Sequence, residues 1–264
     1  MSNSIIKLFQ IDAFTSELFK GNPACVMPLD NWLHDDLLLK IAKENNVSET
    51  AFFIKKDDHF YLRWFTPEIE MDLCGHATLA TAYCLKKHLN YNGDFVKFDS
   101  ISGELIVKYD KDYLQMDFPY RNPVRSELPN NIYDSLSIKP VEILKSRDYV
   151  LVYEHEDQIK NIKIDKELFD KKNIDPGGVV ITAKGNNSDF VSRYFVPQCS
   201  FFEDPVTGST HCSLVPYWSK KLGKQKLKSI QLSDRGGEMF CIDKGNRVLI
   251  NGKAKTYSVG EVFL

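Results

Sequence analysis

Hydrophobic and polar positions along the chain predict many short strands and few helices. Residues 5–14 alternate as a strand would, and residues 31–43 place Leu33, Leu37 and Ile41 on one helical face. The other elements predicted for the first half are a helix at 77–87 and strands at 49–54, 60–65, 95–98, 103–109 and 114–118.

The stretch 120–140 is rich in Pro, Asn and Ser, which is typical of a connector. We therefore expect an N-terminal lobe at 1–119 and a C-terminal lobe at 120–264, with the option that the last strand pairs back with the first lobe. In the second half of the chain, the sequence pattern predicts a helix at 213–222. It also predicts strands near 149–153, 178–182, 189–195, 230, 239–242, 247–250 and 262–264. Helices are too few to cover both faces of a parallel sheet. The expected fold class is α+β, with a curved, mostly antiparallel sheet around one central helix in each lobe.

One segment occurs twice. The sequence RWFTP at 63–67 returns as RYFVP at 193–197, 130 positions later, and an acidic, glycine-centred turn follows each copy, at 70–78 and 203–211. Small residues after a glycine suit a strand-to-helix turn whose backbone N–H groups face an anion. Two such turns, in two similar lobes, predict one ligand held at two helix N-termini.

Composition narrows the choice of partners. The chain has 43% hydrophobic and 27% charged residues, and its 34 basic and 36 acidic side chains are mixed along the sequence. Because no basic block interleaves with aromatic residues, nucleic acid and membrane surfaces are not expected partners. The N-terminus lacks a signal-peptide pattern and no later stretch is apolar for the length of a bilayer, so a cytoplasmic location is expected.

The six cysteines are scattered, with no CxxC pair and no zinc-finger spacing, so neither a disulfide scaffold nor a metal site is expected. Cys74 differs from the others because it directly precedes the first turn glycine, and its counterpart in the second turn is Thr207. The remaining glycine clusters fit neither a phosphate loop nor a dinucleotide fingerprint, so no cofactor is expected.

An ordered set of motifs resembles the phenazine-biosynthesis isomerase (PhzF-like) family. The motifs are GNPA at 21–24, SETAF at 48–52, LRWFTP at 62–67, CGHAT at 74–78, MDFP at 116–119 and EDPVTGS at 203–209. Further matches extend the resemblance from about residue 9 to about residue 240, which is nearly the whole chain.

This resemblance implies a fold like that of diaminopimelate epimerase, with two pseudo-symmetric lobes and the active site in the cleft between them. It implies that Glu49 is the general acid/base and that His76, Asp204 and Ser209 are the polar groups around it. Backbone N–H groups of Gly75, His76, Gly208 and Ser209 suit a substrate carboxylate. A homodimer is also implied.

Cys74 and Thr207 occupy the positions at which epimerase and racemase relatives carry paired catalytic cysteines, and are expected to line the pocket. A threonine hydroxyl cannot replace a thiolate as the second base, so two-thiol racemisation is disfavoured.

The expected function is a cofactor-independent isomerase that moves a proton within a small carboxylate-bearing substrate, such as trans-2,3-dihydro-3-hydroxyanthranilate in phenazine biosynthesis. One alternative is an epimerase or racemase of an amino or hydroxy acid, with Glu49 and Asp204 on opposite faces of the substrate. Another is a metabolite-binding protein without turnover.

Each site residue also has a structural alternative. Glu49 could end a strand at the surface, and His76 could satisfy the backbone at a helix start. Asp204 and Ser209 could be turn and cap residues. For His211, packing is favoured over catalysis.

Overall fold

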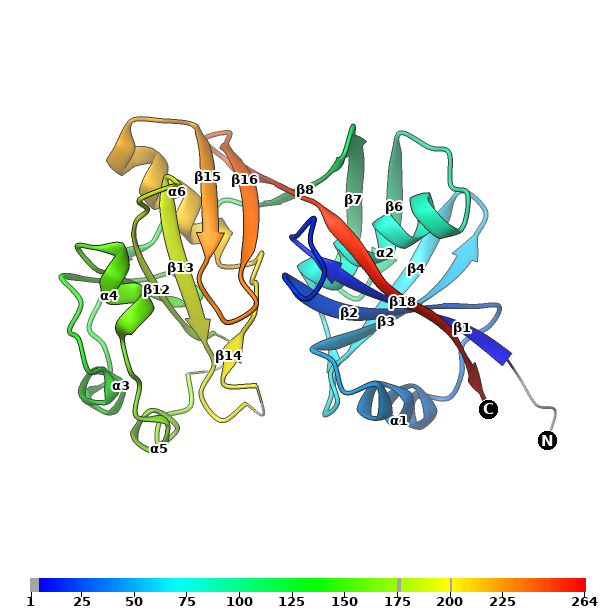
Figure 1. The fold of residues 1–264 in the computed structure, drawn as a ribbon, viewed down its shortest axis with the longest axis horizontal. Coiled ribbons are helices and arrows are strands. Elements are labelled where there is room, and N and C mark those ends of the chain that lie inside the picture. The colour runs from blue at the N-terminus through cyan, green and yellow to red at the C-terminus, as the bar shows by residue number, and fades with distance from the viewer. Residues whose placement is uncertain (1–4, 175–176, 200) are drawn as a thin grey trace. The chain divides into compact units, whose positions relative to one another are not determined.

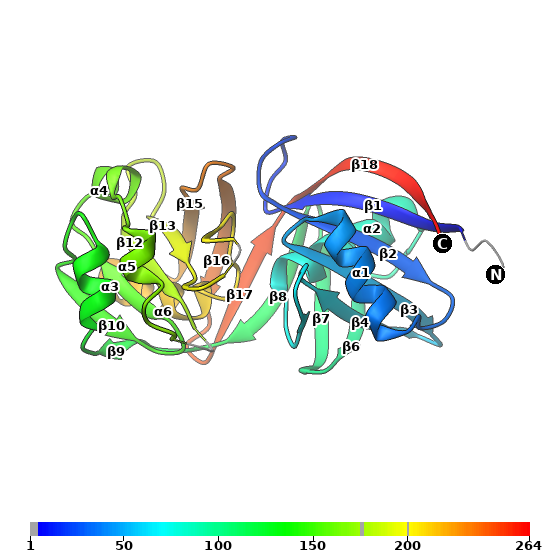
Figure 2. The same ribbon diagram turned by 90° about the horizontal axis from the view of Figure 1, so that it is seen from below.

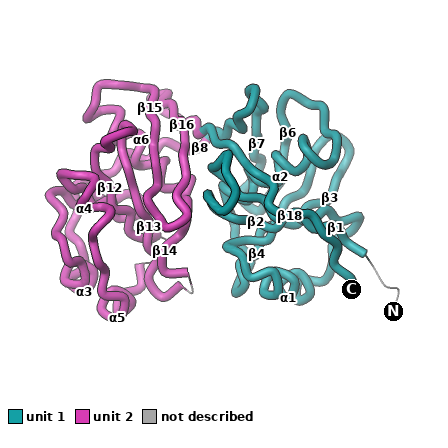
Figure 3. The backbone as a smooth tube through the Cα atoms, viewed as in Figure 1, with its two compact units in different colours: residues 1–117, 251–264 teal, residues 118–250 magenta. Residues whose placement is uncertain are grey.

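The computed structural model describes residues 5–174, 177–199 and 201–264. The chain divides into two compact units (Figure 3). Unit 1 comprises Met1–Asp117 and Asn251–Leu264, and unit 2 comprises Phe118–Ile250. No helix within the described ranges is long and apolar enough to cross a membrane.

The described part of unit 1 is a mixed sheet with two helices. Its elements are β1 (Ile5–Ala13), β2 (Asn22–Leu29), α1 (Asp35–Asn45), β3 (Glu49–Lys56), β4 (His59–Phe65), β5 (Glu70–Met71), α2 (Gly75–His88), β6 (Phe95–Ser100), β7 (Gly103–Asp110), β8 (Tyr113–Pro119) and β18 (Ala254–Phe263). Strand β1 pairs antiparallel with both β18 and β2, and the pairs β3–β4, β6–β7 and β7–β8 are also antiparallel. Parallel pairing joins β2 to β3 and β4 to β6.

Unit 2 also combines β-strands with α-helices. Its elements are β9 (Val124–Arg125), α3 (Asn130–Ser135), β10 (Glu142–Lys145), β11 (Tyr149–Val152), α4 (Glu156–Asn161), α5 (Lys166–Phe169), β12 (Val179–Lys184), β13 (Phe190–Phe195), β14 (Glu203–Asp204), α6 (His211–Leu222), β15 (Lys226–Gln231), β16 (Gly237–Asp243) and β17 (Arg247–Gly252).

The two units repeat one order of strand pairing. In unit 1, β2 is parallel to β3, β3 antiparallel to β4, β4 parallel to β6, and β6 antiparallel to β7. In unit 2 the strands β11, β12, β13, β15 and β16 repeat this sequence of orientations. The duplicated segment lies on β4 and β13, and in both units a two-stranded pairing with β5 or β14 precedes the main helix.

The main helix of each unit is its core. Nine of the 14 residues of α2 are buried, many of them Ala and Thr, and eight of the 12 residues of α6 are buried. A helix buried on nearly all sides must be covered by the sheet around it, and small side chains allow the strands to approach closely. Figures 1 and 2 show α2 among the strands of unit 1 and α6 against the sheet of unit 2. The expected α+β class, with a sheet around a central helix, is confirmed.

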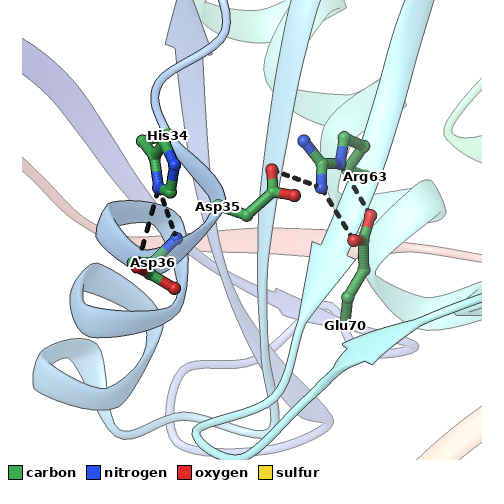
Figure 4. Close-up of polar contacts among 5 residues, drawn as sticks. All are labelled: His34, Asp35, Asp36, Arg63 and Glu70. Carbon is green, nitrogen blue, oxygen red and sulfur yellow. Dashed lines mark hydrogen bonds and ion pairs between the residues drawn. The ribbon is translucent and has the colours of Figure 1, made fainter.

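A bidentate ion pair stands where the duplicated segment begins. In unit 1, Arg63 on β4 donates from Nε to Glu70 Oε1 at 2.6 Å and from Nη2 to Glu70 Oε2 at 2.7 Å (Figure 4). Nη2 also donates to Asp35 Oδ1 at 2.9 Å, which links the strand to the start of α1. The guanidinium lies over the Phe65 ring, 5.1 Å from its centroid. One arginine therefore joins β4, β5 and α1.

Unit 2 repeats this arrangement. Arg193 on β13 donates from Nε and Nη2 to Glu203 on β14, both at 2.7 Å. Its Nη1 donates to the carbonyl of Ile159 in α4 at 3.1 Å, and its guanidinium lies 5.0 Å from the centroid of Phe195. We call these two pairs the arginine clamps. Their recurrence shows that the sequence repeat is also a repeat of contacts.

Several sequence predictions differ from the observed elements. The connector 120–140 contains the helix α3, and the short helices α4 and α5 were not predicted. The second main helix begins at His211 rather than 213, and the first begins at Gly75 rather than 77. Short helices of four to six residues leave too few turns for a hydrophobic period, which explains why they were missed.

The clamps are expected to stabilise the fold more than surface ion pairs do. Replacing Glu70 by Gln removes the charge from a half-buried bidentate pair, and should lower the free energy of unfolding by about 1–2 kcal/mol. Glu104→Gln, which breaks the exposed Lys97–Glu104 pair, should change it by less than about 0.5 kcal/mol. Urea titration of both variants measures the difference, and equal effects would contradict the assigned role of the clamp.

Candidate active site

The first candidate cluster lies at the N-terminus of α2. Cys74 is the N-cap residue, Gly75 and His76 are the first two helical residues, and Glu49 is the first residue of β3. His76 Nε2 lies 3.0 Å from Glu49 Oε2, and the two side chains are only 6% and 15% exposed. The alternative in which Glu49 ends a strand at the surface therefore does not hold.

The other ring nitrogen of His76 has two neighbours. Cys74 Sγ lies 3.4 Å and Asn22 Nδ2 lies 3.3 Å from Nδ1. Asn22 is in turn held by Ser48, whose hydroxyl donates to Asn22 Oδ1 at 2.9 Å. Nδ1 therefore has Cys74 and Asn22 as neighbours, while Nε2 faces Glu49.

Asn22 follows a position that only glycine can occupy. Gly21 has φ +71°, and a Cβ there would lie 2.2 Å from the carbonyl oxygen of Ala13. This turn brings β2 back beside β1 and places Asn22 at the start of β2, within reach of His76.

The polar neighbours change the protonation of His76. Burial alone lowers the pKa of His76, but the contacts with Cys74 and Glu49 outweigh it and raise this pKa well above its usual range. Burial, and then the charge of Glu49, raise the pKa of the Cys74 thiol. The contacts around His76 therefore favour its protonated form, while burial makes the Cys74 thiol harder to ionise.

Glu49, Cys74 and His76 each offer a possible metal ligand, and one donor atom of each lies within 4.8 Å of the others. The ring of His76 stands between the thiol and the carboxylate, with a different nitrogen toward each. A metal ion needs all its donors directed at one point, at about 2.0–2.3 Å. The two nitrogens of His76 thus face two different partners rather than one common point.

The second candidate cluster lies before α6. Asp204 ends β14, and Thr207, Gly208 and Ser209 form the turn that follows. The Thr207 hydroxyl donates to Asp204 Oδ2. The amide group of Gln231 accepts from Thr207 N at 3.0 Å and donates to Asp204 O at 2.7 Å.

His211 supports this turn from within the protein. It is fully buried, its Nδ1 lies 3.0 Å from the carbonyl oxygen of Thr207, and its Nε2 lies 2.6 Å from Ser229 Oγ. Burial lowers the pKa of His211 to about 4, so the ring is neutral at pH 7, with Nδ1–H donating to Thr207. These contacts agree with the packing role expected for His211.

The structure brings the predicted residues into two groups. Glu49, Cys74, Gly75 and His76 gather in unit 1, and Asp204, Thr207, Gly208 and Ser209 gather in unit 2. Sequence reasoning did not assign roles to Asn22, Ser48 or Gln231. Asn22 lies in the GNPA motif and Ser48 in the SETAF motif, so the motifs could have indicated both residues. No motif marks Gln231 as a partner of the turn before α6.

Comparison with known proteins gives the family. A family model described as phenazine biosynthesis-like protein matches residues 11–260. An uncharacterized isomerase of Pseudomonas aeruginosa is 45% identical over 98% of this chain and 99% of the relative. The chain belongs to the phenazine biosynthesis-like family.

Solved structures agree with this membership. A PhzF-family crystal structure from Enterococcus faecalis has 43% sequence identity and a TM-score of 0.94, covering 99% of this chain and 100% of that one. A predicted epimerase of Pseudomonas aeruginosa is 18% identical, covers 97% of this chain and 99% of that one, and has a TM-score of 0.73, which shows that the fold is shared with epimerases. The isomerase names of relatives support an isomerase or epimerase activity.

The buried neutral His211 should make stability depend on pH. Its pKa lies below that of the unfolded chain, so its contribution to stability is present above pH 6.5 and is lost as the pH falls toward about 4. At about 1.36 kcal/mol per pH unit, wild type should lose roughly 3 kcal/mol relative to His211→Asn over that interval. Denaturant unfolding of both proteins from pH 7 to pH 4 measures this change, and a constant difference between them would contradict a neutral His211.

Proposed function

We propose that the protein is a cofactor-independent isomerase that moves a proton between two carbons of a small carboxylate-bearing substrate, with Glu49 as the general acid/base. The observation that carries the proposal is the buried contact between Glu49 Oε2 and His76 Nε2 at the start of α2. A buried carboxylate beside an imidazole is a suitable proton carrier, and a helix N-terminus is a suitable anion site.

In the proposed reaction, backbone N–H groups of Gly75 and His76 bind the substrate carboxylate. Glu49 removes a proton from a neighbouring carbon, and the C–H electron pair enters the conjugated system of the substrate. The N-terminus of α2 stabilises the negative charge that develops. Glu49 then returns the proton to a second carbon, so the reaction needs no oxidant or external acid. Since Oε2 faces His76, we assign proton transfer to Oε1.

For the second cluster we propose that the backbone N–H groups of Gly208 and Ser209 suit a carboxylate at the start of α6, and that the side chains of Asp204 and Ser209 suit polar groups of a substrate. Family membership favours trans-2,3-dihydro-3-hydroxyanthranilate, whose carboxylate and conjugated ring meet the requirements of this mechanism.

The test is proton NMR in deuterated water, with dihydro-hydroxyanthranilate and a panel of amino and hydroxy acids. Wild type should isomerise one of them, whereas Glu49→Gln should lower kcat by at least about 1,000-fold because the amide cannot accept the proton. Glu104→Gln, at an exposed glutamate, serves as the control and should retain full activity.

Other outcomes separate the alternatives. Deuterium uptake with inversion at one stereocentre would identify an epimerase. Tight carboxylate binding without exchange in wild type would identify a binding protein, and unchanged turnover in Glu49→Gln would contradict the role of Glu49.

A further inference from the structure

We propose that Cys74 and Thr207, the residues directly before the two turn glycines, are positioning residues. Each holds the titratable side chain of its own turn in place, Cys74 acting on His76 and Thr207 acting on Asp204. This inference rests on the proposed function and extends it to two residues that take no part in the proton transfer itself.

Cys74 contacts the His76 ring at the nitrogen that faces away from Glu49. Its Sγ lies 3.4 Å from His76 Nδ1, while Nε2, on the far side of the ring, lies 3.0 Å from Glu49 Oε2. Thiol, imidazole and carboxylate therefore form a chain of contacts. Because the ring can rotate about its χ2 bond, its Nδ1 partners, Cys74 and Asn22, together keep Nε2 directed at Glu49.

Thr207, in unit 2, makes a separate contact with a titratable side chain. Its hydroxyl donates to Asp204 Oδ2. The N–H and the carbonyl oxygen of its backbone are both hydrogen-bonded as well. Thr207 N donates to Gln231 Oε1 at 3.0 Å, and its carbonyl oxygen accepts from Thr210 Oγ1 at 2.9 Å and lies 3.0 Å from His211 Nδ1. A hydroxyl on a backbone held this firmly can orient the carboxylate that it contacts.

A buried cysteine that only packs offers a direct contrast. Cys84 lies on the same helix α2 and is fully buried. Burial alone raises the pKa of Cys84 to about 12. Cys74 instead lies beside two titratable side chains. If Cys74 were a small apolar core residue, it should respond to substitution as Cys84 does.

The experiment compares Ala and Ser at both cysteines. We expect Cys74→Ala to lower kcat about tenfold or more, with KM changed less than about threefold, because substrate binding does not use the thiol. Cys74→Ser should keep kcat within about threefold of wild type, since its hydroxyl can contact Nδ1. Neither Cys84→Ala nor Cys84→Ser should change kcat. Equal kcat in the Ala and Ser variants of Cys74, or a higher kcat in the Ala variant, would overturn the proposal.

Thr207 provides the second pair, should the Cys74 variants fail to fold. Thr207→Ser keeps the hydroxyl and should keep kcat within about threefold, whereas Thr207→Val keeps the shape and should lower kcat about tenfold. Equal activity of these two variants would refute the role of Thr207.

A measurement without substrate separates this proposal from the proposed function. Nitrogen-15 NMR of the His76 imidazole should show a shifted Nδ1 signal in Cys74→Ala and an unshifted one in Cys84→Ala. If the signal shifts but wild type turns over no substrate, the positioning contact holds and the proposed function fails. An unshifted signal in Cys74→Ala would refute the contact, whatever the activity.

Discussion

In each unit an arginine clamp joins the duplicated strand to the short strand that follows it and to a neighbouring helix. Arg63 and Arg193 each bind a glutamate through two parallel hydrogen bonds, and each also reaches a neighbouring helix. A planar guanidinium fixes the carboxylate in direction as well as distance. The two-residue strands β5 and β14 have little pairing of their own, so the clamps hold the chain at the point where it turns toward its main helix.

This constraint explains why reactive groups can be placed so close to a helix N-terminus. The chain leaves β5 in a defined direction, reaches Cys74 as the N-cap, and buries His76 against Glu49. In unit 2 the corresponding turn places a hydrogen-bonded Asp204 before α6 instead. The scaffold is thus repeated while its chemistry differs: an imidazole and a thiol in one unit, a carboxylate and hydroxyls in the other.

Much of this was available in the sequence. The repeat of the Arg-aromatic-Phe segment predicted two equivalent strands, and the pattern at 77–87 predicted the main helix of unit 1. The contact between Glu49 and His76 could not be derived from spacing, because it depends on how β3 and α2 are placed by the sheet. The resemblance named both residues, but only the fold brings them within 3.0 Å.

The remaining gaps have equally physical causes. Asn22 reaches His76 because Gly21 adopts a left-handed turn, and Gln231 reaches Thr207 from a strand 24 residues further along the chain. Polar contacts of this kind join positions with no periodic relation to one another. Composition and periodicity therefore predict the layers of the fold but leave out the side chains that support the reactive groups.

The central claim is that one carboxyl group, that of Glu49, both removes and returns the migrating proton. The most direct measurement is mass spectrometry of the product formed in ordinary water from substrate deuterated at the reacting carbon. The account predicts that wild type delivers part of the label to the second carbon and that Glu49→Gln delivers none. Equal label transfer by both proteins would contradict it.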